Sequence, residues 1–237
     1  MTKLNYLNNT YLFEAEAILL KIDKNEKGVS FILDETIFYP QGGGQPADAG
    51  TIISDAAIFT VVDVRLDEKG DVWHYGEISS GTFQKGDRLL LKLDIEKRRM
   101  NARLHSAGHL LDCAVEKIGI PNLVPTKGFH FPEGPYVEYE GVLEKTPALI
   151  LELEATINEL IAQNIIVESK SLTPEIAKEQ GVWAPPGKGA RIVNFKGFPY
   201  CGCGGTHVNS AKEIGKVVVR KIKSKKGKTR IAYALEN

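Results

Sequence analysis

From about residue 11 to residue 93, short apolar runs alternate with turn-forming residues. The strands that this pattern predicts are 15–22, 29–34, 59–66, 72–75 and 89–93. Lys24–Gly28 joins the first two strands and Asp67–Gly70 joins the next two, so both pairs are predicted hairpins. Many short strands without a helical period are typical of a small β-barrel.

Beyond residue 93 the apolar spacing becomes helical in two long segments. Residues 94–118 and 147–164 each place apolar side chains three or four positions apart. Thr146 can cap the second helix, and Pro147 suits its first turn. A shorter helix is predicted at residues 174–180.

The other predicted strands lie between and after these helices. They are 128–139, with an interruption at Pro132–Pro135, and 165–169, 191–195, 216–222 and 229–235. The last two are expected to pair as a hairpin, whereas Trp183–Gly187 is not expected to be regular. The mixed order predicts an α+β protein, with a barrel domain at residues 1–93 and an α+β domain at residues 94–237.

Two short motifs carry candidate metal chemistry. They are HSAGH at residues 105–109 and CGGTH at residues 203–207. Two histidines four positions apart on a helix share one face, which lets them bind one ion. Imidazole nitrogen and thiolate sulfur are zinc ligands, whereas calcium and magnesium prefer carboxylates. The sequence therefore predicts one zinc ion, and its four ligands are His105, His109, Cys203 and His207.

The spacing of these motifs argues against two common zinc proteins. A zinc finger closes its ligand pairs over roughly a dozen residues, whereas Cys203 lies 94 positions after His109. HSAGH also lacks the glutamate of HExxH, the general base of zincin proteases. Cys113 lies on the same helical stripe, and we expect it to be a buried core thiol rather than an additional metal ligand.

Charge and cysteine content indicate the kind of partner and the cell compartment to expect. The 237 residues include 30 basic and 30 acidic side chains. Eight Lys or Arg and no acid occur between Lys216 and Arg230, which favours a polyanion-binding surface over a merely solvated one. The N-terminus has no signal-peptide pattern, and three cysteines form no disulfide framework. We therefore expect a cytoplasmic protein without a membrane partner.

The two motifs, together with FYPQGGGQP at residues 38–46, resemble the AlaX family of free-standing alanyl-tRNA editing proteins. That family is similar to the editing domain of alanyl-tRNA synthetase, and the resemblance spans about residues 15–235. It implies a small barrel followed by a zinc-containing α+β editing domain. The implied reaction is hydrolysis of mischarged tRNA(Ala), chiefly Ser-tRNA(Ala), with Gly-tRNA(Ala) as a further candidate and Ala-tRNA(Ala) spared. tRNA, not DNA, is the implied partner, and a monomer is favoured.

The resemblance also implies roles for particular residues. The loop that an aminoacylated RNA end would approach comprises Gly42, Gly43, Gly44 and Gln45, although the residues alone favour a tight turn with positive φ. Thr36 is the candidate reader of a serine hydroxyl, with an ordinary strand residue as the alternative. Gly108 and Thr126 stand where the synthetases usually have a bulkier residue and a glutamine, so both bear on pocket shape.

Basic side chains are the candidate contacts to tRNA phosphates. They are Lys223, Lys225 and Lys226 in the C-terminal hairpin and Arg99 and Arg103 in the first helix. Lys97 and Arg98, beside them in the sequence, can face phosphate in the same way. The alternative for each of them is a solvated helix face or turn.

The number of ligands leaves the role of the zinc open. Four protein ligands are typical of a structural zinc, whereas a catalytic zinc keeps one position open. One ligand can leave the zinc, the site can expand to five ligands, or the reaction can take place beside a structural ion. Among these we favour a direct role of the zinc in the reaction. The alternative function is a zinc-stabilised tRNA-binding module without catalysis. A complete synthetase does not fit within a chain of 237 residues.

Overall fold

The structure is a computed structural model that describes residues 1–25, 28–120, 122–144, 146–182 and 189–236. It divides into two compact units, of which unit 1 comprises Met1–Gly42 and Pro46–Met100. Unit 2 comprises Gly43–Gln45 and Asn101–Asn237. The long helix α1 (Ile95–Lys117) begins in unit 1 and continues in unit 2.

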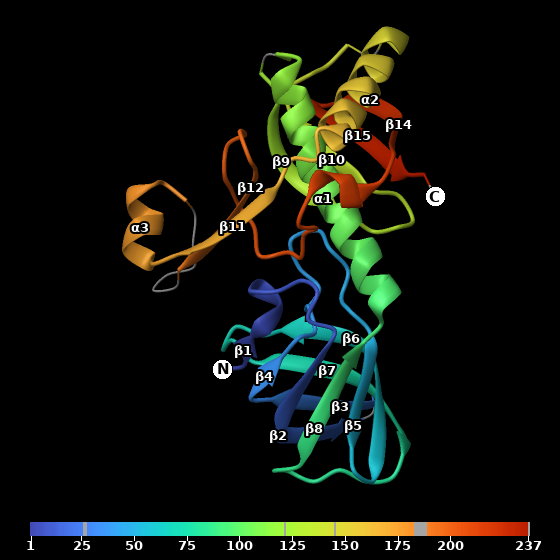
Figure 1. Cartoon of the computed structure of the whole chain (residues 1–237), viewed down its shortest axis with the longest axis vertical. Coiled ribbons are helices and arrows are strands. Elements are labelled where there is room, and N and C mark those ends of the chain that lie inside the picture. Colours follow the sequence, from blue (N-terminus) through green and yellow to red (C-terminus); the bar gives the residue numbers. More distant parts are fainter. Residues whose placement is uncertain (26–27, 121, 145, 183–188, 237) are drawn as a thin grey trace. The chain divides into compact units, whose positions relative to one another are not determined.

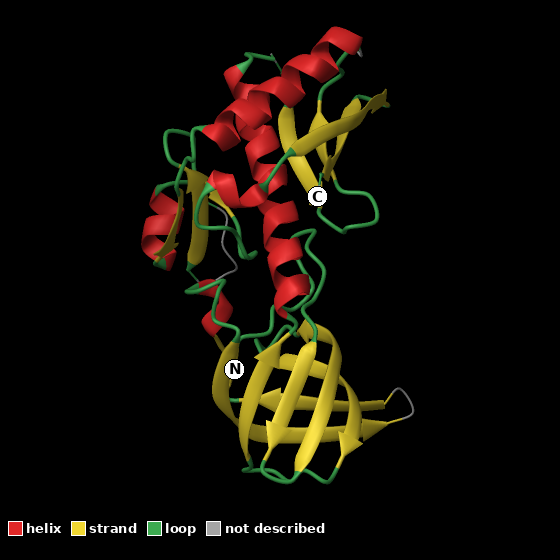
Figure 2. Ribbon diagram, turned by 45° about the vertical axis from the view of Figure 1, so that its right-hand side comes forward, coloured by secondary structure: helices red, strands yellow, loops and turns green. Residues whose placement is uncertain are grey.

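Unit 1 contains a closed antiparallel barrel of six strands (Figure 1, Figure 2). In barrel order the strands are β2 (Glu14–Asn25), β3 (Gly28–Leu33), β7 (Val72–Ser80), β6 (Ala57–Leu66), β5 (Gly50–Ser54) and β8 (Arg88–Leu93). Alternating side chains fill the interior, where the rings of Phe31 and Phe59 stack with centroids 4.1 Å apart. The predicted barrel and both of its predicted hairpins are confirmed.

Three short elements of unit 1 were not predicted from the sequence. β5 is five residues long, and two-residue strands β1 (Lys3–Leu4) and β4 (Glu35–Thr36) pair in parallel beside the 3₁₀ helix η1 (Asn5–Leu7). Runs this short show neither a helical nor an alternating period clearly, because both patterns need several repeats. Their pairing depends on strands that are distant in the sequence.

In unit 2 the helix α2 (Pro147–Ala162) packs against β14 (Val217–Lys225), the first strand of the C-terminal hairpin (Figure 1). The hydroxyl of Thr146 accepts a hydrogen bond from Leu149 N at 3.1 Å, which confirms the predicted cap. The helix buries a stripe that comprises Leu153, Thr156, Ile157, Leu160 and Ile161. Both long helices are therefore where the apolar spacing predicts them.

A four-stranded antiparallel sheet forms the second layer of unit 2. Its order is β14 (Val217–Lys225), β15 (Lys228–Leu235), β10 (Tyr136–Glu140) and β9 (Val124–Phe129). The predicted C-terminal hairpin is confirmed as β14 and β15. The single interrupted strand predicted at residues 128–139 is instead two paired strands, because β9 begins four residues earlier and turns back through Pro132–Pro135.

A second, smaller sheet in unit 2 presents one of the metal-binding motifs. It comprises β11 (Val167–Leu172), β12 (Ala190–Phe195) and β13 (Cys201–Gly202), with α3 (Pro174–Glu179) after β11 and η2 (Ala211–Ile214) after β13. The prediction for Trp183–Gly187 lies outside the described residues. A barrel followed by helices and antiparallel sheets confirms the predicted α+β class. Within the described part of the chain, no helix is long and apolar enough to cross a membrane.

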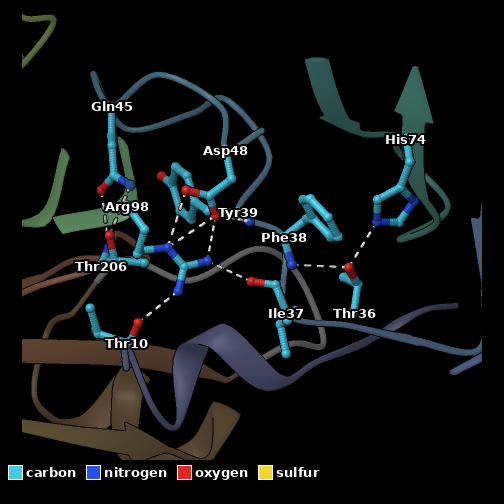
Figure 3. Close-up of polar contacts among 10 residues, drawn as sticks. All are labelled: Thr10, Thr36, Ile37, Phe38, Tyr39, Gln45, Asp48, His74, Arg98 and Thr206. Atoms are coloured by element: carbon cyan, nitrogen blue, oxygen red, sulfur yellow. Dashed lines mark hydrogen bonds and ion pairs between the residues drawn. The ribbon is translucent and has the colours of Figure 1, made fainter. Parts of the chain in front are cut away.

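Arg98, at the start of α1, is fully buried, so the expectation that it faces phosphate is wrong. Its guanidinium forms an ion pair with Asp48, with Nε 3.1 Å from each carboxylate oxygen (Figure 3). It also donates to the carbonyls of Thr10 and Ile37, while Asp48 accepts from Tyr39 N at 2.6 Å. Removing one partner of such a pair costs about 3–5 kcal/mol. Arg98 therefore holds the loops of unit 1 together.

Candidate metal centre and the cavity beside it

Four side chains in unit 2 bring their donor atoms within 4.8 Å of one another, and we call them the metal cluster: His105, His109, Cys203 and His207. Helix α1 supplies the first two, and the loop after β13 supplies the others. Cys203 Sγ lies 3.4 Å from His105 Nε2 and 3.2 Å from His207 Nε2. Three imidazoles and one thiol at this spacing can hold a metal ion such as zinc. The four residues predicted as ligands are thus the four that the fold brings together.

Gln45 fixes the orientation of His105. Its Oε1 accepts a hydrogen bond from Thr206 N at 3.0 Å and lies 2.8 Å from His105 Nδ1. Its amide nitrogen donates to the Thr206 hydroxyl at 2.9 Å. Because Oε1 can only accept, His105 carries its proton on Nδ1 and leaves Nε2 free for an ion.

The other two histidines are oriented in the same way. His207 Nδ1 lies 3.1 Å from the hydroxyl oxygen of Ser106, which also accepts from Val208 N. His109 Nδ1 lies 3.0 Å from Cys201 Sγ, whose thiol donates to the carbonyl of Val193. Histidines that bind metal usually donate their second ring N–H to such a partner. The surroundings of the cluster therefore fit a metal ion at all three Nε2 atoms.

Burial keeps the three imidazoles of the cluster in the neutral form that binds metal. It lowers the pKa of His109 to about 4 and the pKa values of His105 and His207 well below 6.5, so all three are neutral at pH 7. Burial raises the pKa of the Cys203 thiol, although Gly205 N–H at 3.4 Å and the charge of Arg191 oppose this shift. Cys203 is therefore a thiol before an ion binds, and binding releases its proton.

The tight loop around Cys203 depends on glycine and on Arg191. A Cβ atom on Gly205 would lie 2.1 Å from His105 Cε1, so any larger residue would push the loop away from the helix. Arg191 donates to the carbonyls of Cys203 at 3.1 Å and Gly205 at 2.9 Å. These contacts hold the CGGTH segment against α1.

A cavity of about 290 Å³ adjoins the metal cluster within unit 2. Besides His105, His109 and Cys203, its wall includes Gly43, Gly108, Asp112, Thr126, Lys127 and His130. Gly43, Gly108 and Thr126 were expected near a substrate, and the fold places all three at this cavity. The Thr126 hydroxyl donates to the carbonyl of Glu138 at 3.1 Å.

The Gly-rich segment is a turn in which Gly43 and Gly44 have positive φ, of 52° and 78°. The turn that its residues favour is therefore present. A Cβ atom on Gly44 would lie 2.2 Å from the carbonyl oxygen of Gly128, and this close approach requires glycine. Gly42 and Gly43 are exposed, whereas Gln45 is fully buried and supports the metal cluster.

Thr36 lies in unit 1 and is fully buried. Its hydroxyl oxygen accepts from Phe38 N at 3.0 Å and lies 2.8 Å from His74 Nε2 (Figure 3). His74 Nδ1 lies 3.2 Å from the carbonyl of Phe31 and must donate to it, so Nε2 accepts the proton of Thr36. Burial lowers the pKa of His74 to about 4, which keeps the ring neutral.

Several residues at the cavity were not predicted, among them Asp112 and His130. Burial raises the pKa of Asp112 to about 7, and the hydrogen bond from the Tyr139 hydroxyl at 2.7 Å opposes this rise. His130 stacks on His105 with ring centroids 4.4 Å apart. Neither residue belongs to a spaced motif, so the sequence offers no signal for them except their residue types.

The candidate RNA contacts differ in exposure. Lys223, Lys225 and Lys226 are exposed at the end of the β14–β15 hairpin. Arg99 is exposed and lies 3.8 Å from Glu96, whereas Arg103 is half-buried and donates to the carbonyl of Ile214 at 3.0 Å. The hairpin lysines are therefore better placed than Arg103 to reach a phosphate.

Comparison with known proteins agrees with this architecture. Residues 5–97 match the family described as class II (A) tRNA synthetases. Residues 190–232, which include half of the metal cluster, match the second additional domain of threonyl and alanyl tRNA synthetases. The fold and the cluster thus define a protein of the synthetase editing-domain class.

Three similar relatives narrow the class to one family. The chain is 33% identical over 243 residues to the alanyl-tRNA editing protein AlaX-M of Pyrococcus horikoshii, covering 100% of this chain and 99% of that relative. It is 32% identical over 235 residues to AlaX-L of the same organism, covering 96% of this chain. It is 34% identical over 202 residues to alanine–tRNA ligase 1 of Lachnoclostridium phytofermentans, covering 84% of this chain. The chain belongs to the AlaX family of alanyl-tRNA editing proteins, as its motifs predict.

The matched relatives differ in how much of their length this chain represents. It spans 56% of AlaX-L and 23% of alanine–tRNA ligase 1. The ligase therefore has most of its length outside the shared region.

Proposed function

We propose that this protein is a zinc-dependent hydrolase that deacylates mischarged tRNA(Ala). The substrates are chiefly Ser-tRNA(Ala) and also Gly-tRNA(Ala), and Ala-tRNA(Ala) is spared. The observation that carries this proposal is a His₃Cys cluster, three residues of which line a 290 Å³ cavity, in a chain of the AlaX family. The reaction adds water to the ester carbonyl and releases the free amino acid and the tRNA. Such a substrate places the activity in the cytoplasm.

The four cluster residues would hold the zinc through three Nε2 atoms and the Cys203 thiolate. When bound, zinc supplies a Lewis acid next to the cavity. Gln45, Ser106 and Cys201 keep the imidazoles in the required tautomer and orientation. Gly205 and Arg191 keep Cys203 against α1.

Asp112 is our candidate for handling the proton of the attacking water. It lines the cavity, and its pKa of about 7 lets the carboxylate accept a proton near neutral pH. The Tyr139 hydroxyl holds one carboxylate oxygen, which fixes the orientation of the group. Lys127, at the same wall, adds a positive charge that suits the phosphate of an RNA end.

Selection of serine over alanine requires a polar contact. Alanine is smaller than serine, so a pocket that admits serine cannot exclude alanine by size. A site that pairs a buried polar group with the hydroxyl can reject the analogue by a factor on the order of 10⁴, compared with about 10² for an apolar pocket. Thr36 remains a proposed reader of the hydroxyl, and Gly108 and Thr126 are proposed to shape the pocket.

For the tRNA we propose contacts at two surfaces. The exposed glycines Gly42 and Gly43 would let an RNA backbone approach closely, and Lys223, Lys225 and Lys226 would contact phosphates. Arg99 and Arg103 are proposed to add to this charge. The proposed working form is a monomer that binds tRNA(Ala) and neither DNA nor a membrane.

Deacylation of purified aminoacyl-tRNAs tests the function. We expect the zinc-loaded protein to release serine from Ser-tRNA(Ala), a chelator to stop the reaction, and added zinc to restore it. Binding of tRNA and zinc without release of serine would favour the alternative, a zinc-stabilised tRNA-binding module, which the closed set of four donors permits.

A further inference from the structure

His130 lies beside the metal cluster without belonging to it. Its ring stacks on the ring of His105, with centroids 4.4 Å apart and planes 21° apart. The residue is 3% exposed and lines the 290 Å³ cavity. Buried polar groups normally have hydrogen-bond partners, so the role of His130 depends on what its two ring nitrogens contact.

One ring nitrogen of His130 has a fixed partner in the Tyr233 hydroxyl. His130 Nδ1 lies 2.7 Å from that oxygen, and Tyr233 donates its single hydroxyl proton to the carbonyl of Leu104 at 2.9 Å. A hydroxyl that has donated its proton can only accept from a further neighbour. His130 therefore carries its proton on Nδ1, and Nε2 is an acceptor with a free lone pair.

Two glycines leave the space that the His130 ring occupies. A Cβ atom on Gly108 of α1 would lie 2.4 Å from His130 Cε1, and a Cβ atom on Gly128 of β9 would lie 2.2 Å from His130 Nε2. Real Cβ atoms do not come this close to another heavy atom, so a side chain at either position would displace the ring. Gly108 and Gly128 line the same cavity. Because Gly128 has no side chain, no Cβ atom covers Nε2 of His130, which lines this cavity.

The backbone of His130 is held as well. Its N–H donates to the carbonyl of Gly44 at 2.8 Å, and Gly44 packs directly on Gly128. The position of the His130 ring is thus fixed by the backbone hydrogen bond, by the contact of Nδ1 with Tyr233 and by the close packing of Gly108 and Gly128. A rigid acceptor is suited to selecting between ligands, because it cannot turn away when the matching donor is missing.

We propose that His130 Nε2 is the acceptor by which the cavity distinguishes a hydroxyl-bearing aminoacyl group from alanine, with Thr36, whose own proton goes to His74, as the alternative reader. This inference rests on the proposed deacylase function. The α-ammonium group is common to serine, glycine and alanine, so an acceptor that reads it gives no selection. The serine hydroxyl is the donor by which serine differs from both. When alanine occupies the site, its methyl group displaces water from Nε2 and supplies no partner, which is unfavourable for a buried polar atom, whereas glycine has no methyl group and leaves room for that water.

The decisive variant is His130→Phe, which keeps a planar ring and removes the acceptor. We expect deacylation of Ser-tRNA(Ala) to slow and the Ser-to-Ala ratio of kcat/KM to fall on the order of 10- to 100-fold, the effect of one buried polar contact. Deacylation of Gly-tRNA(Ala) is the internal control, because glycine has no hydroxyl and its rate should stay within a few fold.

Tyr233→Phe is the matched second variant. It leaves the imidazole in place but removes the group that fixes its tautomer, so we expect a smaller fall in the Ser-to-Ala ratio. Long-range ¹⁵N–¹H NMR of the wild-type protein should show the His130 proton on Nδ1. Zinc content and thermal stability are measured for both variants to verify that the cluster is intact.

The results separate the two proposals. A wild-type protein that deacylates none of the three tRNAs contradicts the proposed function. Wild-type activity together with an unchanged Ser-to-Ala ratio in His130→Phe overturns the assignment of His130 alone. Equal slowing on Ser-tRNA(Ala) and Gly-tRNA(Ala), or a proton on Nε2 in the wild type, would also overturn it.

Discussion

Gln45 Oε1 lies 2.8 Å from His105 Nδ1 and 3.0 Å from Thr206 N, so one side chain contacts both metal-binding segments. The amide is fully buried, and it supports a histidine that is 60 positions further along the chain. The last residue of the Gly-rich segment is thereby part of the support of the metal cluster.

Gln45→Ala should weaken metal binding. His105 would lose the acceptor that fixes its tautomer, and loss of such an outer contact typically lowers metal affinity 10- to 100-fold. Competition with a chromophoric chelator measures the zinc affinity directly. Gln41→Ala, at an exposed position of the same loop, is the control and should leave the affinity unchanged. Equal affinities for Gln45→Ala and the wild type would contradict the supporting role.

The two neighbouring cysteines should differ in their effect on zinc content. Cys203→Ala and His109→Ala each remove a donor of the cluster, so we expect loss of stoichiometric zinc and of turnover. Cys201→Ala removes only the neighbour of His109 Nδ1 and should retain zinc at saturating concentration, with weaker affinity. Metal analysis of the purified variants decides this. Full zinc in Cys203→Ala together with loss in Cys201→Ala would show that the wrong cysteine was assigned.

Thr36→Val should affect both stability and selectivity. It leaves His74 Nε2 and Phe38 N without their partner in the barrel, which should lower the free energy of unfolding by about 1–3 kcal/mol. If Thr36 reads the serine hydroxyl, the Ser-to-Ala rate ratio also narrows. Urea unfolding and the two deacylation rates measure these effects. Thr60→Val, at an exposed hydroxyl pair, is the control for stability. An unchanged ratio removes Thr36 from the selection of substrate.

Asp112 should make the stability of the protein depend on pH. Its pKa is about 7 in the folded state and ordinarily 3.8, so the folded state binds more protons between these values. The free energy of unfolding contributed by this group therefore falls as the pH rises from about 4 to about 7. Asp112→Asn removes this fall and should be more stable than the wild type at pH 8, while deacylation slows.

Denaturant unfolding at pH 5 and pH 8 tests this behaviour. Glu116→Gln, one helical turn further along α1 at an exposed position, is the control. It should change neither the free energy of unfolding nor the deacylation rate. A wild-type protein whose stability does not depend on Asp112 at pH 8 would contradict the raised pKa. Full activity of Asp112→Asn would exclude Asp112 from proton transfer.

The exposed hairpin lysines should contribute to tRNA affinity through counterion release. Reversal of charge at Lys223, Lys225 and Lys226 should weaken binding and flatten the plot of log affinity against log salt, by roughly 0.9 for each duplex phosphate that is no longer neutralised. Reversal at Lys69 and Lys85, exposed lysines of unit 1, is the control. An unchanged salt slope would show that the hairpin is only a solvated surface, and zinc content should be unaffected in every case.

The sequence predicts those parts of the molecule whose signal is local. His105 and His109 are one helical turn apart and CGGTH is a compact motif, so both halves of the cluster are visible before the fold is known. Apolar period alone locates α1, α2 and five of the six barrel strands. β5 is missed because its pairing with β6 and β8, and not its own five residues, makes it a strand.

Contacts between distant segments could not be predicted. Gln45 and His105, His130 and Tyr233, and Asp48 and Arg98 are pairs separated by 60, 103 and 50 positions. Each residue alone is compatible with an exposed position, and Arg98 was wrongly expected at the surface for that reason. Only the fold shows which buried polar group meets which.

The metal cluster is proposed to serve hydrolysis of mischarged tRNA(Ala). The most direct measurement is the rate of serine release from Ser-tRNA(Ala) by the zinc-loaded protein, the chelator-treated protein and the protein after zinc is restored, with Ala-tRNA(Ala) in parallel. We predict rapid release from Ser-tRNA(Ala), loss with chelator, recovery with zinc, and little release of alanine. Serine release that is absent from the zinc-loaded protein, or alanine release that is as fast, would contradict the account.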